Sequence, residues 1–494
     1  MSKERIDIMS KERFDKIIKI AKKRGFFYQS CEIYKPISGF WHYGTVGVLL
    51  KKKIEEEWRR FFIKSEGFYE IEGTNIMPKD VFVASGHLKG FSDPIVQCKK
   101  CNSLYRADQL IYETLGIFIP ERTNEEEFDK IIKEKNLRCI KCKGELMNTR
   151  FFNMMFELGV GASEKRETAY LRPETCQSIF VDFLNIYRAM RPKLPFGIAQ
   201  IGRSFRNEIS PRQGLLRQRE FTQAEAEIFF DPSIKEFENF EKVKNVELNI
   251  LRAGKKEAEK MSLEELIKNN IIDNELFGYY LAKVQEFVNS LGIPLSAIRF
   301  REQEENERPF YAKLAFDCEV YTSIGWIEIV ANHYRTDHDL KSHSEISGKD
   351  LSILIDNKKI IPHVWEISQG IDRTLFCVMM HAFKDDREWS YFSFEPKIAP
   401  YSVAVFPLVS KNGLPEKAKD VYKILRKDFD CLYDESGSIG KRYARADEIG
   451  VPFCITIDYQ TLEDNTVTIR DVNTTDQVRI KIESIVDFIK RMIS

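Results

Sequence analysis

The stretch from 197 to 230 carries charged side chains at a spacing that suits chemistry on a sheet surface. Two runs of strand-like alternation flank a basic loop, which predicts a β-hairpin. Side chains on a strand alternate between faces, so Arg206 and Glu208 are expected to point the same way. On the return strand one face should carry Phe221, Gln223, Glu225 and Glu227. A guanidinium, carboxylates and an aromatic ring suit a zwitterion and a nucleotide, although a solvated face of an antiparallel sheet is the simpler alternative.

A strand, a glycine turn and a helix are predicted from 364 to 376. Alternation places Glu366 and Ser368 on one strand face. Gly370 then opens a turn into a helix that carries Arg373. By itself the pattern is equally typical of an ordinary strand-to-helix turn with a surface arginine.

Length and composition favour a soluble protein of several domains. The chain has 494 residues, of which 43% are hydrophobic and 31% charged, and such a length suits about three domains. A formal net charge of zero neither supports nor excludes an RNA partner, because binding needs only a local positive surface. We find no apolar run long enough for a bilayer and no secretory signal, so we expect a cytoplasmic protein without a membrane partner.

Several elements must position these side chains. Residues 46–63 suit an amphipathic helix that leads into a strand ending near Pro78. Residues 235–295 are rich in Lys, Glu, Leu and Ile and predict a helical insert, and 296–395 return to strands that end on a helix. From 398 onward short β-rich runs alternate with helices, which indicates an α/β module with a partly parallel sheet.

Residues 96–145 contain a candidate metal site. Two CxxC turns supply Cys98 and Cys101, then Cys139 and Cys142. Each turn can present two thiolates to one tetrahedral ion, and four sulfurs predict a closed structural Zn²⁺ site. Disulfides are the alternative, but they fit poorly with a cytoplasmic chain.

The hairpin resembles motif 2 of the class II aminoacyl-tRNA synthetases. Its Phe205-Arg206-Asn207-Glu208 core and the REFTQAE string at 219–225 are similar to the glycyl-tRNA synthetases within that class. The helix and strand at 46–78 resemble motif 1, which lies at the dimer interface in the family, and 364–376 resemble motif 3. The resemblance extends over most of the chain.

The resemblance implies an α+β fold, in which helices flank an antiparallel class II catalytic sheet. The catalytic domain would comprise 1–95 and 146–395, interrupted by a zinc-ribbon-like insert at 96–145 and containing the helical insert at 235–295. An α/β anticodon-binding domain would follow at 398–494. The family also implies a homodimer.

The implied reaction joins glycine to ATP as glycyl-adenylate and then passes glycine to the 3′ end of tRNA(Gly). The glycine carboxylate is already a nucleophile, so catalysis can rest on positioning and on neutralising phosphate charge. The implied catalytic residues are Arg206 on the α-phosphate and Arg373 on the γ-phosphate, with Mg²⁺ beside Glu328. Phe221 would stack on adenine, whose amine would donate to Glu208. The implied ATP-binding set also includes Asn207, Leu216, Arg217, Ile329 and Gly370.

The implied glycine-binding set is Arg106, Glu174, Gln223, Glu225, Arg335, Glu366 and Ser368. Glu174 would face the ammonium, Arg335 would pair with the carboxylate and Arg106 would reach the substrate. The run from Ala331 to Tyr334 is bulkier than the small residues usual in the family. A pocket filled to the size of glycine excludes larger amino acids by clash, so we expect no editing domain.

Three other functions compete with this interpretation. A non-catalytic paralogue would be favoured by loss of Arg206, Glu208 or Arg373, and all three are present. Another class II enzyme, of the prolyl or threonyl type, agrees less well with the acidic residues of the glycine-binding set. A zinc-ribbon nucleic-acid binder would leave every motif outside the ribbon unexplained.

Overall fold

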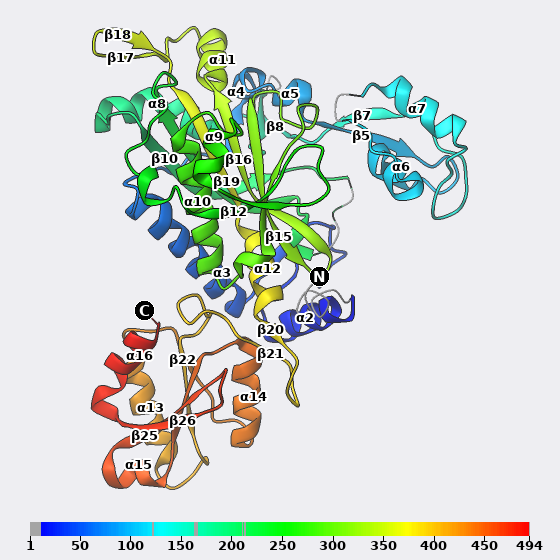
Figure 1. Cartoon of the computed structure of the whole chain (residues 1–494). Coiled ribbons are helices and arrows are strands. Elements are labelled where there is room, and N and C mark those ends of the chain that lie inside the picture. Colours follow the sequence, from blue (N-terminus) through cyan, green and yellow to red (C-terminus); the bar gives the residue numbers. More distant parts are fainter. Residues whose placement is uncertain (1–10, 121–122, 163–165, 210, 212–213, 494) are drawn as a thin grey trace.

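The computed structural model describes residues 11–120, 123–162, 166–209, 211 and 214–493 (Figure 1). A nine-stranded sheet forms the centre of the part of the chain that precedes the C-terminal five-stranded sheet. Its strands, in spatial order, are β13 (Glu259–Ser262), β12 (Glu247–Leu251), β14 (Ile298–Glu302), β15 (Leu314–Thr322), β16 (Gly325–Thr336), β19 (His363–Gly370), β11 (Glu220–Phe230), β10 (Phe196–Phe205) and β3 (Tyr69–Glu70). Neighbours are antiparallel except for the pairs β12 with β14 and β10 with β3. The predicted antiparallel sheet is therefore confirmed.

The predicted hairpin is confirmed, but its first strand is shorter than expected. Strands β10 and β11 pair from Phe196 opposite Phe229 to Phe205 opposite Glu220. The backbone then bends, because the N–H of Glu208 donates to the carbonyl of Arg206 at 2.7 Å, which is incompatible with an extended strand. The expectation that Arg206 and Glu208 share a strand face is therefore wrong, since both lie in the loop after β10.

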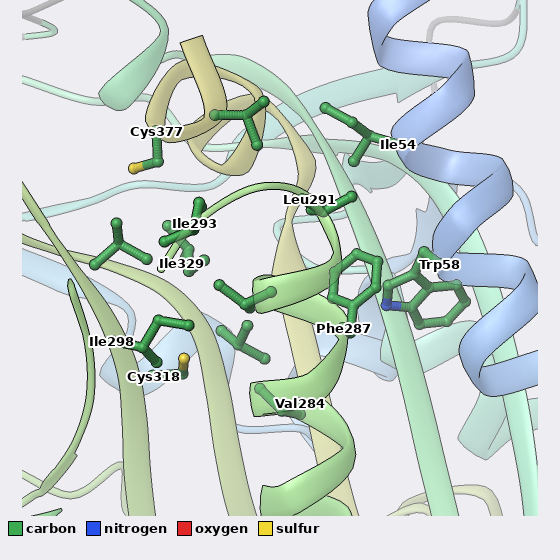
Figure 2. Close-up of a cluster of buried hydrophobic side chains, with 14 of the residues drawn as sticks. Ile54, Trp58, Val284, Phe287, Leu291, Ile293, Ile298, Cys318, Ile329 and Cys377 are labelled. Carbon is green, nitrogen blue, oxygen red and sulfur yellow. The ribbon is translucent and has the colours of Figure 1, made fainter. Parts of the chain in front are cut away.

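The two faces of the sheet have different coverings. On β11 the side chains of Ala224, Ala226 and Ile228 face a core built with α3 (Thr45–Trp58), α10 (Glu275–Ser290) and α12 (Ile371–Ala382). Figure 2 shows part of this core, with Trp58 of α3 beside Phe287 of α10. The opposite face, which includes Phe229, packs at one end against α8 (Cys176–Met190) and α11 (His338–Ser347). By strand alternation Glu225 and Glu227 of β11 belong to this second face.

The helical prediction for 235–295 is wrong for its first half. Residues 247–262 contain β12 and β13, which extend the edge of the main sheet, and helices α9 (Leu263–Lys268) and α10 follow. Leu248 and Ile250 are both buried and lie two positions apart. This spacing is the period of a strand, and it outweighs the helix-forming composition of the segment.

The cysteine-bearing segment projects from the side of the main sheet (Figure 1). It contains the three-stranded sheet β6-β5-β7. Its elements are β5 (Ser92–Gln97), β6 (Leu104–Arg106), α6 (Ala107–Leu115), α7 (Glu125–Glu134) and β7 (Arg150–Asn153). A second three-stranded sheet, β4-β9-β8, connects this segment to the centre through β4 (Ile76–Pro78), β8 (Phe156–Val160) and β9 (Glu167–Leu171).

The predicted α/β module with a partly parallel sheet is confirmed at the C-terminal end. Its sheet has the order β23-β22-β24-β25-β26, and only the first three strands are parallel. The strands are β22 (Val403–Pro407), β23 (Cys431–Tyr433), β24 (Phe453–Ile457), β25 (Thr466–Asp471) and β26 (Gln477–Lys481). The helices are α13 (Leu414–Leu425), α14 (Ile439–Ile449), α15 (Tyr459–Asp464) and α16 (Ile485–Ile493).

The remaining α-helices and strands, with one π-helical turn, lie outside these sheets. They are α2 (Lys11–Arg24), β1 (Phe27–Gln29), β2 (Trp41–Tyr43), the π-helical turn η1 (Arg59–Lys64), α4 (Lys79–Ala84), α5 (His87–Gly90), β17 (Ile353–Ile355), β18 (Lys358–Ile360), β20 (Phe383–Lys384) and β21 (Tyr391–Phe392). Glu448 of α14 accepts hydrogen bonds from Lys23 and Arg24, which ties α2 to the C-terminal module. Within the described residues, every helix is too short or too polar to traverse a lipid bilayer.

Candidate functional site

Arg206 and Phe221 lie together at one end of the site. The guanidinium carbon of Arg206 is 5.3 Å from the centre of the Phe221 ring and 5.3 Å from that of Phe91. Its Nε donates to the carbonyl oxygen of Pro173 at 3.1 Å. A guanidinium over aromatic faces is a favourable cation–π arrangement. The positive group and the stacking ring predicted for a nucleotide are thus neighbours, although the bend after β10 rather than a strand places Arg206.

Glu208 belongs to a second group of charges. Its carboxylate accepts from Nε of Arg217 at 2.6 Å, and Nη2 of Arg217 is also 3.7 Å from Asp93. Asp93 in turn pairs with Nη1 of Arg106 at 3.0 Å, and Arg106 also contacts Asp108. Arg106 therefore lies beside the Glu208 group, and among the described residues its ion pairs are with Asp93 and Asp108 rather than with an acidic residue of the predicted glycine-binding set.

Arg373 and Glu328, which are both predicted to bind ATP, contact each other at the surface. Nη1 of Arg373 is 3.4 Å from the Glu328 carboxylate and 3.2 Å from its carbonyl oxygen, and Nε donates to the carbonyl of Leu216 at 3.1 Å. Their side chains are 38% and 46% exposed, so the ion pair is weak and solvated. Both groups are available to a charged ligand.

Ile329, like Leu216, belongs to the predicted ATP-binding set but is a core residue. Its side chain is only 2% exposed and lies in the hydrophobic core (Figure 2). The pairing of β15 with β16 shifts between Cys318 and Glu319, next to this residue. Such β-bulges re-aim neighbouring side chains. Only the backbone of Ile329 can therefore serve a ligand.

Glu225, Gln223 and Ser368 form one buried, hydrogen-bonded group. In the pairing of β11 with β19, Glu225 lies opposite Ser368, so both share a face. Ser368 Oγ donates to Glu225 Oε1 at 2.6 Å, and Gln223 Nε2 reaches the same oxygen at 3.2 Å. Burial raises the pKa of Glu225, and the negative charges of Glu174 and Glu366 raise it further.

A short segment before α8 joins the two ends of the site. The carbonyl of Pro173 accepts from Arg206, whereas Thr175 donates through its backbone N–H (2.7 Å) and its hydroxyl (2.5 Å) to Glu225. Glu174 lies between them and accepts from Gln177 Nε2 at 2.9 Å. The guanidinium of Arg206 and the acidic group are therefore held by consecutive residues.

The surroundings of Glu174 favour its ionised form despite its burial. Burial alone raises the pKa of Glu174, but the charge of His87, a hydrogen bond with that ring and the charge of Arg335 hold it well below the ordinary value. Nε2 of His87 lies 3.5 Å from Glu174. A strong negative charge at this position suits a bound ammonium group.

Arg335 lies at the centre of the acidic residues. Its Nε and Nη2 donate to Asp339 at 2.7 and 2.8 Å, and Nη1 donates to Glu366 at 2.8 Å. The guanidinium also lies 3.8 Å from the ring centre of Tyr311 and is 1% exposed. It therefore orients Glu366, while its predicted contact with a substrate carboxylate stays a prediction.

The bulky run from Ala331 to Tyr334 does not interrupt the sheet. Each of its residues pairs with β19, including Ala331 with Ser368 and His333 with Glu366. Nδ1 of His333 lies 2.7 Å from the second oxygen of Glu366. Burial lowers the pKa of His333, but the hydrogen bond to Glu366 and its charge raise it more. His333 was not among the residues predicted for the site, although it lies two positions before Arg335 and both side chains contact Glu366.

The four cysteines of the inserted segment are brought together. Their sulfur atoms all lie within 4.8 Å of one another, with 3.5 Å between Cys98 and Cys142 and 3.6 Å between Cys101 and Cys139. Tetrahedral Zn²⁺ with bonds of about 2.3 Å separates its sulfur ligands by roughly 3.8 Å. The backbone N–H of Lys100 also points to Cys98 Sγ at 3.4 Å. The cluster is compatible with bound zinc.

Comparisons with known proteins match both parts of the chain. Residues 155–382 match the tRNA synthetase class II core domain (G, H, P, S and T), and residues 402–492 match the anticodon binding domain. The glycine–tRNA ligase of Methanocaldococcus jannaschii is 39% identical over 574 aligned residues, which cover 98% of this chain and 99% of the relative. That of Pyrococcus furiosus is 39% identical over 569, covering 98% and 100%. That of Methanothermobacter thermautotrophicus is 39% identical over 559, covering 97% and 99%.

Proposed function

The chain belongs to the glycine–tRNA ligases, and on that premise we propose how its residues activate glycine and pass it to tRNA(Gly). It is a class II enzyme with an antiparallel catalytic core and a C-terminal anticodon-binding domain. Its reaction joins glycine to ATP with release of pyrophosphate, and the glycyl group then moves from the adenylate to the 3′ end of the tRNA. Each residue of the site has a proposed role in one of these steps.

Activation rests on positioned positive charge. Arg206 binds the α-phosphate, where negative charge grows as the glycine carboxylate attacks phosphorus and pyrophosphate leaves. Phe221, whose ring already contacts this guanidinium, stacks on adenine, and Glu208 accepts a hydrogen bond from the adenine amine. The same nucleotide is bordered by Asn207, Leu216, Arg217 and Gly370.

The other end of ATP lies at Arg373 and Glu328. The solvated pair separates easily, which frees Arg373 for the γ-phosphate and Glu328 for a cation. Mg²⁺, when bound, neutralises phosphate charge, and a carboxylate oxygen such as that of Glu328 is the kind of ligand it prefers. Ile329 contributes only backbone atoms.

Glycine is recognised by the buried acidic group, and this group is the observation that carries the proposal. Glu225 is held by donors from Thr175, Ser368 and Gln223 at a fixed position, with ionised Glu174 beside it. Such a site suits an ammonium ion. Glu366 and Arg335 complete it, and Arg335 and Arg106 remain the proposed partners of the glycine carboxylate.

Further assignments follow the family. We propose a homodimer that associates through the segment around α3 and β4. We also propose a cytoplasmic location, because the ten cysteines, all of which lie within the described residues, form no disulfide. Residues 96–145 form the zinc-bearing insert, 398–494 bind the anticodon, and the remainder, including the segment 235–295, forms the catalytic domain.

The direct test is ATP–pyrophosphate exchange measured with each of the twenty amino acids, followed by acylation of tRNA(Gly). We expect exchange with glycine and only background with alanine, because the filled pocket rejects an added methyl group by clash. Exchange with proline or threonine would instead indicate another class II specificity. Binding of tRNA without exchange by any amino acid would indicate a non-catalytic paralogue.

Zinc in the insert gives a separate prediction. The purified enzyme should retain about one zinc ion per chain after gel filtration, because four thiolates form a closed site. Cys139→Ser should remove most of this zinc and make 96–145 more susceptible to proteolysis, as measured by metal analysis and limited digestion. Cys31→Ser, at an exposed cysteine outside the cluster, is the matched control and should retain the metal. Equal zinc contents in the two variants would exclude the assignment.

A further inference from the structure

One buried acid near the glycine pocket has no assigned role. Glu227 lies on β11 directly opposite Glu366 of β19 and is 0% exposed. Neither of its carboxylate oxygens has a hydrogen-bond partner among the residues that the structure describes. A buried carboxylate without a partner is costly, so the group must gain a proton or a positive neighbour.

The surroundings of Glu227 do not supply that positive charge. One of its oxygens, one oxygen of Glu366 and the sulfur of Cys176 lie within 4.8 Å of one another. Both oxygens of Glu366 are already engaged, one by Arg335 and the other by His333. Cys176 of α8 directs its thiol to Glu174 at 3.0 Å. The nearest groups are therefore either negative or occupied elsewhere.

The balance of charge around Glu227 is acidic. The charged groups that act on it are Glu366 on β19, Arg335 on β16, Glu225 on its own strand and Asp339 on α11. Arg335, the cation among them, already bonds Asp339 and Glu366. Burial and then the charge of Glu366 raise the pKa of Glu227 well above its ordinary value.

We propose that Glu227 carries a proton in the free enzyme and releases it when the ammonium group of glycine binds beside Glu174, Glu225 and Glu366. The inference rests on the glycine pocket proposed above. The incoming ammonium brings one positive charge into a group with an excess of negative charge, and this charge replaces the proton. The Oε–H bond of Glu227 breaks, the proton passes to the buffer, and the ammonium keeps its three protons.

Proton release makes glycine binding depend on pH with a definite sign. Bound glycine favours the ionised form of Glu227, whose pKa in the free enzyme is raised. The KM for glycine should therefore fall as the pH rises, until the free enzyme has itself lost this proton. The effect applies below the pKa of the glycine ammonium, where the substrate keeps its charge.

Calorimetric titration of the full-length enzyme with glycine tests the proposal. Titrations at one pH in phosphate and in Tris, which differ in ionisation enthalpy, count the protons released. We expect release of up to about one proton per active site from the wild type and none from Glu227→Gln, in which a neutral amide replaces the neutral acid. Glu167→Gln, at an exposed position, is the matched control and should release as the wild type does.

His333 and Glu225 are the other candidate sources of a proton, because their pKa values are also raised. Release that persists undiminished in Glu227→Gln would overturn the proposal, whichever of the two supplies the proton. Disappearance of that release in His333→Gln would assign the proton to His333. Absence of release from the wild type would overturn the proposal as well. If Glu227→Gln does not fold, the infrared difference spectrum of the wild type decides, since glycine must remove a protonated-carboxyl band. Absence of any glycine binding would instead contradict the proposed function.

Discussion

Arg206→Ala is expected to lower the rate of glycine-dependent ATP–pyrophosphate exchange by about 10²–10³-fold, the usual effect of removing one donor that stabilises transition-state charge. Among the described residues the guanidinium makes one hydrogen bond, to Pro173, and contacts the rings of Phe91 and Phe221. Its removal should therefore affect the α-phosphate far more than the fold. The thermal unfolding midpoint should stay close to that of the wild type.

Arg203→Ala is the matched control for this change. Arg203 lies three positions earlier on β10, opposite Thr222. Its side chain is 41% exposed and lies on the face of the sheet away from Glu225 and Glu227. The control should retain most of the exchange activity. Undiminished exchange in Arg206→Ala, or an equal loss in both variants, would remove Arg206 from the proposed mechanism.

Much of the fold could be predicted because local patterns agree with tertiary structure. The alternation on β11 and β19 is a property of any strand, so the shared face of Gln223, Glu225 and Glu227 on β11, and that of Glu366 and Ser368 on β19, followed from spacing alone. Arg206 shows the limit of this reasoning. The spacing of Arg206 and Glu208 resembles a strand, but a bend formed by their own backbone groups ends β10 at Phe205.

The partners of each charge were harder to predict than the charges themselves. Arg335 of β16 is satisfied by Asp339 in the first turn of α11 and by Glu366 on another strand. The contact with Glu366 depends on how β16 and β19 pair, and that register is not visible in either segment alone. The same register places His333 on Glu366 and leaves the carboxylate of Glu227 without a hydrogen-bond partner in the part of the chain that the structure describes. Arg106 was predicted to reach glycine, and its side chain pairs with Asp93, a residue that no local pattern singles out.

Glu225→Ala is expected to have the largest effect on the use of glycine. The change removes a buried carboxylate that would bind the ammonium, and it leaves donors of Thr175 and Ser368 unpaired. Truncation of one partner of a buried, hydrogen-bonded charge pair costs about 2–5 kcal/mol of binding free energy. A loss of about 4 kcal/mol predicts a fall in kcat/KM for glycine of roughly three orders of magnitude.

The kinetic pattern of Glu225→Ala distinguishes a substrate ligand from a structural residue. Since Glu225 lies with the ammonium-binding group and not with Arg206 or Arg373, the KM for ATP should change little while the KM for glycine rises. Glu220→Ala is the matched control, because Glu220 begins the same strand, lies on its other face and is 39% exposed. Parallel losses for ATP and glycine in Glu225→Ala, together with a lower unfolding midpoint, would mean that Glu225 supports the fold of the hairpin and does not select the substrate.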